Sequence, residues 1–130
     1  MRQTWAEIAE FFRQKRNIGT DEFGSAMAAI EALAASIAEG RLNASLVGWI
    51  SMHDLCIKQT DTSESNREPY LRLSPLQSGL VEFRYFDTYV TAQQWNRVVP
   101  PEGVAGRMTS FLDQLRWVAR VSPAIDEAAR

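Results

Sequence analysis

The sequence predicts a small α+β domain in which helices cover one face of an antiparallel sheet. Residues 70–88 alternate apolar side chains with others, which is the pattern of two paired strands. Segments near both ends of the chain instead repeat apolar residues at intervals of three and four, which is the pattern of helices. The predicted order is an N-terminal helical hairpin, a three- or four-stranded antiparallel β-meander and a C-terminal helix packed on the sheet. All 130 residues are expected to form one domain.

The helical hairpin is predicted over residues 1–40. Thr4 begins a capping box, with a glutamate three residues later, and starts a first helix with apolar positions at helical spacing. Gly19 is expected to stop this helix, and a second one begins near Thr20. The apolar stripe of the second helix over 23–37 requires a partner to cover it, so the two helices should pack together.

Residues 45–99 are expected to hold the sheet, and their first part is ambiguous. Between 46 and 58 the residues are typical of strands, but neither alternation is continuous, because Ile50 belongs to one face and Leu55 to the other. Two interpretations stay open. Either both faces of one strand are partly covered, or a bulge near His53 and Asp54 switches the faces.

The hairpin over 70–88 is the best-defined strand pair in the sequence. Its turn residues are Pro75 and Gly79, so a loop over 75–79 is predicted. The expected pairs are Leu73 with Val81, Leu71 with Phe83 and, on the other face, Arg72 with Glu82. A shift of one residue would turn the apolar face of one strand away from that of the other, so the apolar residues should face the core.

The remaining segments complete this prediction. Residues 60–69 are polar and without periodicity, which predicts an exposed, mobile loop. Residues 89–99 form either a fourth short strand or an irregular connection. A strong apolar stripe predicts the C-terminal helix over 101–121, leaving 122–130 as a tail that can start a further short helix.

Composition excludes several functions. The formal net charge is −2, whereas a protein that binds duplex nucleic acid normally carries a basic footprint. No apolar run approaches the ~20 residues that span a bilayer, and no signal peptide is visible, so no membrane partner is expected. The single cysteine, Cys56, excludes an intramolecular disulfide and suggests a reducing compartment, so the location expected is cytoplasmic.

Catalytic signatures are lacking in the sequence. His53, Asp54 and Cys56 form a weak alternative site, since a histidine can activate a thiolate. In an extended strand, however, His53 and Cys56 point to opposite faces, and Cys56 is expected to be a buried packing residue. One histidine and one cysteine cannot form a usual zinc site. No catalytic residue, metal or cofactor is therefore predicted.

An interaction surface is the favoured functional interpretation. The hairpin face opposite the core carries a mixture of aromatic rings and arginines, which is typical of interfaces. The candidate interface residues are Tyr70, Arg72, Glu82, Arg84 and Phe86, together with Trp117 beside the apolar stripe of the last helix. They predict a small soluble, non-catalytic protein–protein interaction module with a protein partner of unknown identity, such as an inhibitor, an immunity-type protein or an adaptor. A homodimer is expected. The alternative is a small-ligand-binding protein or an enzyme with a pocket between sheet and helices.

Overall fold

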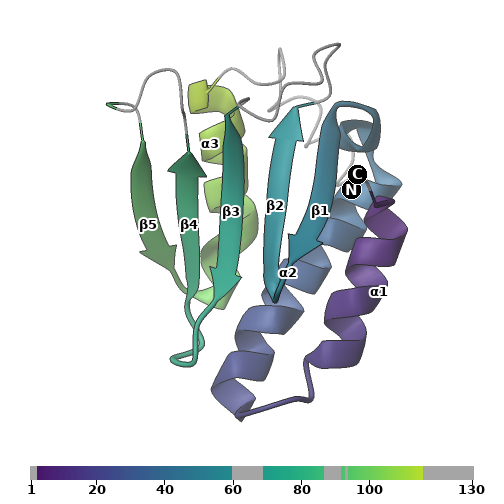
Figure 1. Ribbon diagram of the computed structural model, residues 1–130, viewed down its shortest axis with the longest axis vertical. Helices are drawn as coiled ribbons and strands as arrows, with labels where there is room; N and C mark the ends of the chain where they lie inside the picture. Colours follow the sequence, from purple (N-terminus) through teal and green to yellow (C-terminus); the bar gives the residue numbers. More distant parts are fainter. Residues whose placement is uncertain (1–2, 60–68, 87–91, 93, 116–130) are drawn as a thin grey trace.

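A computed structural model describes residues 3–59, 69–86, 92 and 94–115. Three helices lie on one side of a five-stranded sheet whose neighbouring strands are all antiparallel (Figure 1). The helices are α1 (Trp5–Lys15), α2 (Asp21–Glu39) and α3 (Val104–Leu115), with short 3-10 turns η1 (Arg41–Ala44) and η3 (Pro101–Gly103). The strands are β1 (Leu46–Ser51), β2 (Asp54–Gln59), β3 (Tyr70–Pro75), β4 (Val81–Phe86) and β5 (Trp95–Val99). The α+β class is confirmed. The predicted tail 122–130, and the predicted mobile loop 60–69 apart from its last residue, lie outside the described residues.

The predicted helical hairpin is confirmed as α1 and α2. Both hydrogen bonds of the capping box form, because the Thr4 hydroxyl accepts from the Glu7 N–H at 3.1 Å and the Glu7 carboxylate accepts from the Thr4 N–H at 3.0 Å. Gly19 then takes a φ of +87°, which suits glycine, and the Thr20 hydroxyl caps α2 through the N–H of Phe23 at 3.1 Å. The loop between the helices is therefore short.

The sheet has five strands, so the prediction of three or four was wrong. Residues 46–58 form a hairpin of two strands, β1 and β2, joined by Met52 and His53. Because the chain reverses there, Ile50 and Leu55 lie opposite each other and share one face despite their different parity. A reversal of the chain, and not a bulge, switches the faces. Within the predicted 89–99 segment, Trp95–Val99 form the strand β5.

The register of the β3–β4 hairpin differs by two residues from the predicted one. Its loop is 76–80, closed by the Leu76 N–H donating to the Leu80 carbonyl at 2.9 Å, so the proline stays in β3. The observed pairs are Pro75 with Val81, Leu73 with Phe83, Leu71 with Tyr85, Arg72 with Arg84, Ser74 with Glu82 and Tyr70 with Phe86. The predicted pairing of Arg72 with Glu82 was therefore wrong. Because side chains alternate with period two, a shift of two leaves every residue on its predicted face.

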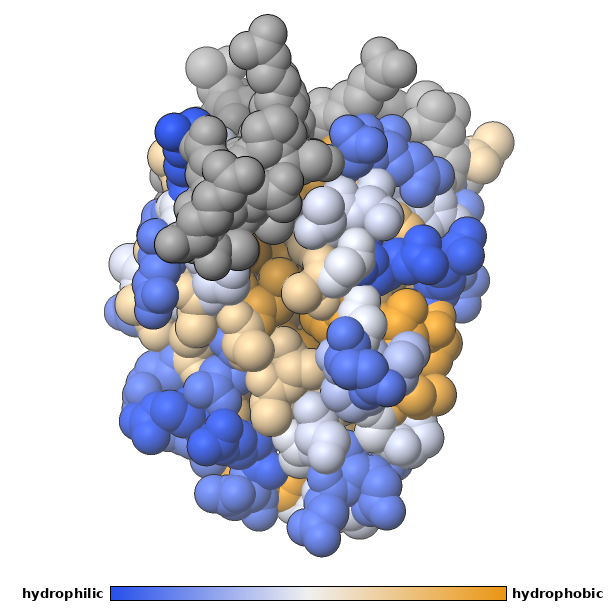
Figure 2. Space-filling model, turned by 180° about the vertical axis from the view of Figure 1, so that it is seen from behind, coloured by the Kyte–Doolittle hydropathy of each residue, from blue (hydrophilic) through white to orange (hydrophobic). Residues whose placement is uncertain are grey.

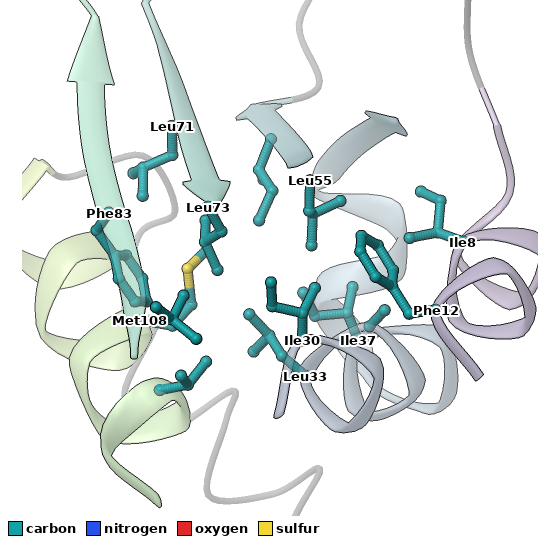
Figure 3. Packing of buried hydrophobic residues seen from close by; sticks show 14 of the residues in the cluster. Ile8, Phe12, Ile30, Leu33, Ile37, Leu55, Leu71, Leu73, Phe83 and Met108 are labelled. Atoms are coloured by element: carbon teal, nitrogen blue, oxygen red, sulfur yellow. The ribbon is translucent and has the colours of Figure 1, made fainter. Parts of the chain in front are cut away.

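The core lies between the sheet and the helices, where side chains from both layers point toward one another (Figure 3). As predicted, Leu71, Leu73, Val81 and Phe83 are buried, and the Phe83 ring packs on Phe111 of α3 with centroids 5.2 Å apart. The side chain of Leu115, which was expected to join them, lies outside the described part. No helix in the described ranges is both long and apolar enough to cross a membrane.

Helix α1 packs closely on the first strand at Gly48. A Cβ atom added at Gly48 would lie 2.8 Å from Ile8 Cδ1 and from Trp5 Cη2. Both side chains are buried, so neither can move away without disturbing the core. Glycine is therefore required at this position for a close approach of helix and strand rather than for an unusual backbone conformation.

Candidate functional site

The face of the sheet opposite the helices, hereafter the open face, holds the candidate site. It faces the viewer in Figure 1, and none of the described helices lies in front of it. Side chains on this face alternate with the core residues along each strand. By the observed register they are Val47, Trp49, Ser51, Asp54, Cys56, Lys58, Tyr70, Arg72, Ser74, Glu82, Arg84, Phe86, Asn96 and Val98.

A charged cluster occupies the middle of the open face. Arg72 on β3 and Arg84 on β4 lie directly opposite each other, an arrangement in which like charges repel. One carboxylate compensates for both, because the Oδ2 atom of Asp54 on β2 accepts from Arg72 Nε at 2.6 Å and from Arg84 Nη2 at 3.4 Å. The Asp54 and Arg72 side chains are 17% and 23% exposed, so water screens this pair only in part.

Further polar groups fix the two guanidinium groups in place. Arg84 Nη2 also donates to the Ser74 hydroxyl at 2.9 Å, and Arg72 Nη2 donates to the Ser51 hydroxyl at 3.4 Å. The Arg84 Nε atom is buried and has no hydrogen-bond partner among the described residues, although the Glu82 carboxylate lies 3.8 Å away. The cluster therefore presents two positioned arginines, each still partly exposed.

A row of aromatic rings runs beside this cluster. The rings of Trp49 and Tyr70 have centroids 5.6 Å apart, and Tyr70 stacks on Phe86 at 5.0 Å. The guanidinium of Arg84 lies over the Phe86 ring at 5.7 Å, within the range of a cation–π contact. The three rings are half-buried, so they form a partly exposed apolar ridge along the charged cluster.

The structure places five of the predicted interface residues together on this face. Tyr70, Arg72, Glu82, Arg84 and Phe86 all point to the open face, whereas Trp117 lies outside the described residues. Their role in binding stays a proposal.

Two further members of the site were missed by the sequence prediction. Trp49 was not predicted because the parity of residues 46–58 was ambiguous, and a clear turn signal at Met52 would have resolved it. Asp54 was assigned to the weak catalytic alternative rather than to the arginines.

That weak alternative site is not assembled. The His53 ring lies in the β1–β2 turn with its centroid 6.4 Å from the Phe11 ring and 6.1 Å from the Phe23 ring, both on helices. Cys56 is buried on the open face, where burial raises the pKa of its thiol to about 11. The thiol is thus protonated near neutral pH and has no histidine to activate it. The described residues also contain no group of three or more histidine, cysteine or acidic side chains that could hold a metal ion.

Among the described residues, two hollows on the surface are relevant to ligand binding, one on each side of the molecule. One of about 260 Å³ extends the open face between β4 and β5 and is lined in part by Arg84, Phe86 and Asn96. On the opposite side of the molecule, apolar residues gather across the middle, with hydrophilic residues below them (Figure 2). There a cavity of about 60 Å³ lies between α2 and α3, with Ile37 and Met108 in its lining. That volume is far below the ~300 Å³ at which pockets for drug-sized ligands begin.

Comparisons with known proteins found no match to a family model, a curated protein or a solved structure. The candidate site is therefore defined by its geometry. That geometry combines positioned arginines with a row of aromatic rings on a sheet face that no described helix covers. Arginine and aromatic residues are the types enriched in protein interfaces.

Proposed function

We propose that the chain is a non-catalytic protein–protein interaction module whose open face binds a protein partner. The observation that carries this proposal is the ridge of Trp49, Tyr70 and Phe86 beside the two arginines that Asp54 holds. The few residues that dominate binding energy in protein interfaces are enriched in tryptophan, tyrosine and arginine. Side chains that are already held in place also lose less conformational entropy when a partner binds.

The charges on the open face indicate what this partner should present. Lys58, Arg72 and Arg84 outnumber the carboxylates of Asp54 and Glu82, so this face is net positive although the whole chain has a formal charge of −2. A complementary surface would place carboxylates opposite the arginines and an apolar side chain opposite the aromatic ridge. An inhibitor, an immunity-type protein or an adaptor would act through such a surface. The single, buried cysteine supports a cytoplasmic location for this module.

We also infer that the chain associates with itself as a homodimer. The sheet is open, so β1 and β5 are edge strands. An edge strand that is not covered can pair with a strand of another chain. Two-fold pairing of identical surfaces is the commonest route to a soluble oligomer. Self-association and binding of a different protein use separate surfaces in this proposal, so they can be tested separately.

Binding through the open face can be tested with four purified variants. The immobilised chain is first used to capture proteins from the source cells. Each captured protein is purified and then titrated against wild type, Phe86→Ala, Arg84→Gln and two controls. The matched controls are Ile18→Ala, which removes an exposed apolar side chain between α1 and α2, and Arg13→Gln, which removes an exposed arginine on α1. Each open-face variant should raise Kd at least ~10-fold, while the controls leave it unchanged. Equal affinities for all four folded variants would contradict the proposal.

A further inference from the structure

Gln3 and Trp5 cover one edge of the sheet. Trp5 Nε1 donates to the Leu46 carbonyl of β1 at 2.9 Å, and the Gln3 N–H donates to the Gly48 carbonyl at 3.4 Å. The Gln3 side chain also accepts from the Ile50 N–H at 2.8 Å. In a hairpin with a two-residue turn, the residues on either side of the turn, here Ser51 and Asp54, are hydrogen-bonded to each other. Every second residue of β1 counted back from Ser51 therefore bonds to β2. The backbone groups of the residues between them, Leu46, Gly48 and Ile50, point away from β2. The β1 edge is therefore protected from pairing with another strand.

The opposite edge, β5, has no such cover among the described residues. Leu76 and Leu80 are hydrogen-bonded across the 76–80 loop, and in an antiparallel pair every second residue bonds to the neighbouring strand. The even-numbered residues of β4 therefore bond to β3, and its odd-numbered residues bond to β5. On β5, this leaves the N–H and C=O groups of Asn96 and Val98 pointing outward. Both residues are exposed, and the Val98 side chain is 45% exposed although it is apolar. The strand contains neither a proline nor a bulge, two of the devices that block edge pairing.

We propose that a second copy of this chain pairs with the β5 edge in antiparallel fashion, with the two-fold axis passing beside Asn96. The two five-stranded sheets would then form one continuous sheet. This inference rests on the self-association proposed above and names the surface that performs it. It does not depend on the open face binding a different protein.

Asn96 and Val98 of one β5 can meet Asn96 and Val98 of a second β5 in three antiparallel registers. The registers differ in which side chains they place opposite each other. An axis beside Arg97 sets the two Arg97 guanidinium groups directly opposite each other, where they repel. An axis beside Val98 pairs Asn96 with Pro100, which has no N–H to donate.

An axis beside Asn96 avoids both problems. It pairs Asn96 with its own copy. Asn96 Nδ2 donates to the Glu82 carboxylate at 3.3 Å within the chain, and its second N–H and its amide oxygen can still donate to and accept from an identical amide. It also places Arg97 of one copy opposite Trp95 of the other, on the helix side of the sheet, where a guanidinium and an indole ring attract each other. The remaining pair joins Val98 to Gln94, so part of the exposed apolar surface of Val98 is covered. The edge is thus complementary to itself in this register.

Sedimentation over a range of protein concentrations tests whether β5 forms the contact. Wild type should form a dimer, and Val98→Pro should raise its dissociation constant at least ~10-fold, because proline removes an N–H that points away from β4. The matched control Val98→Ala keeps that N–H and should still dimerise. A wild type that is monomeric at every concentration, as would result if residues 116–130 covered the edge, overturns both self-association and this edge. A dimer that Val98→Pro does not weaken overturns only the edge.

Disulfide crosslinking in the Cys56→Ala background tests the register. Asn96→Cys places two thiols across the axis, with Cα atoms ~5.5 Å apart, within the range that a disulfide spans. Arg97→Cys and Val98→Cys are matched controls. In this register the two copies of residue 97 are two residues, or ~7 Å, apart along the strands, and the two copies of residue 98 are four residues, or ~14 Å, apart. Mild oxidation should crosslink Asn96→Cys and neither control. Crosslinking of Arg97→Cys or Val98→Cys in place of Asn96→Cys would overturn the Asn96 register.

Discussion

At position 54, one carboxylate lies against two guanidinium groups that face each other across β3 and β4. Hydrogen bonds to charged groups contribute ~1.5–3 kcal/mol each to stability when they are sheltered from water. Removal of Asp54 also takes away the one carboxylate that Arg72 and Arg84 share, so the two guanidinium groups repel each other more strongly. We therefore expect Asp54→Ala to lower the free energy of unfolding by ~1–3 kcal/mol, measured by urea denaturation. The control Glu82→Ala, whose carboxylate is 3.8 Å from Arg84, should cost less. Equal losses would mean that Asp54 does not hold the cluster.

Cys56 is a second residue whose environment predicts a measurable behaviour. Because its thiol is buried and protonated, a thiol reagent should label the native protein slowly at neutral pH and rapidly only after unfolding. Rapid labelling of the native protein would contradict the structure.

The raised pKa of Cys56 also predicts how stability depends on pH. An unfolded thiol loses its proton near pH 9, whereas the native thiol keeps it until about pH 11. Between pH 9 and pH 11 the unfolded chain therefore loses this proton more readily than the native protein, which favours unfolding. The contribution of Cys56 to the free energy of unfolding is complete below pH 9 and decreases toward pH 11. The difference in unfolding midpoint between wild type and Cys56→Ala should decrease over this range. A difference that stays constant would show that the thiol titrates normally in the native state.

At the scale of elements, strand β4 separates the two faces of the sheet clearly. Phe83 is fully buried against α3, whereas Phe86 on the same strand is half-exposed on the open face. Phe83→Ala should cost about 3–5 kcal/mol of stability, because it leaves a cavity in a close-packed core. Phe86→Ala is the matched control and should cost less than half as much in the same urea denaturation. Similar losses for the two variants would mean that the faces of β4 are wrongly assigned.

The turn between β1 and β2 is an element that the chain forms against local preference. Met52 has a φ of +60°, a left-handed conformation that costs a residue with a Cβ atom ~1–2 kcal/mol, and its side chain is 84% exposed. Asparagine tolerates this conformation better, and little packing would be lost. Met52→Asn should therefore recover part of that cost and stabilise the protein by ~0.5–1 kcal/mol, seen as a higher thermal midpoint. A midpoint that falls would show that the methionine side chain makes a contribution of its own.

At the scale of the whole molecule, the described helices form one layer and leave one sheet face and the β5 edge uncovered by described residues. If the β5 edge pairs two copies, the thermal midpoint of wild type should rise with protein concentration, because mass action favours the folded dimer. Val98→Pro should lose most of this dependence, whereas Phe86→Ala on the open face should keep it. A midpoint independent of concentration in wild type would contradict the dimer.

Local periodicity was enough to predict several features of the fold. Helical spacing predicted α1, α2 and α3, and a period of two predicted which side chains of β3 and β4 face the core. It thereby also placed Tyr70, Arg72 and Arg84 on a common face. These predictions hold because a side chain's direction follows from its position in a helix or strand, whatever the rest of the chain does.

Features that depend on which strands are neighbours could be read only from the folded chain. Alternation with period two cannot distinguish a register from one shifted by two residues, so only the pairing of β3 with β4 shows that Arg72 faces Arg84 and not Glu82. The two central residues of the β1–β2 turn, Met52 and His53, are not among the types that two-residue hairpin turns prefer, which hid both a strand and the place of Trp49. The approach of Asp54 to the two arginines likewise arises from strands that are distant in sequence. Contacts of this kind are set by packing across the sheet, and no local pattern encodes them.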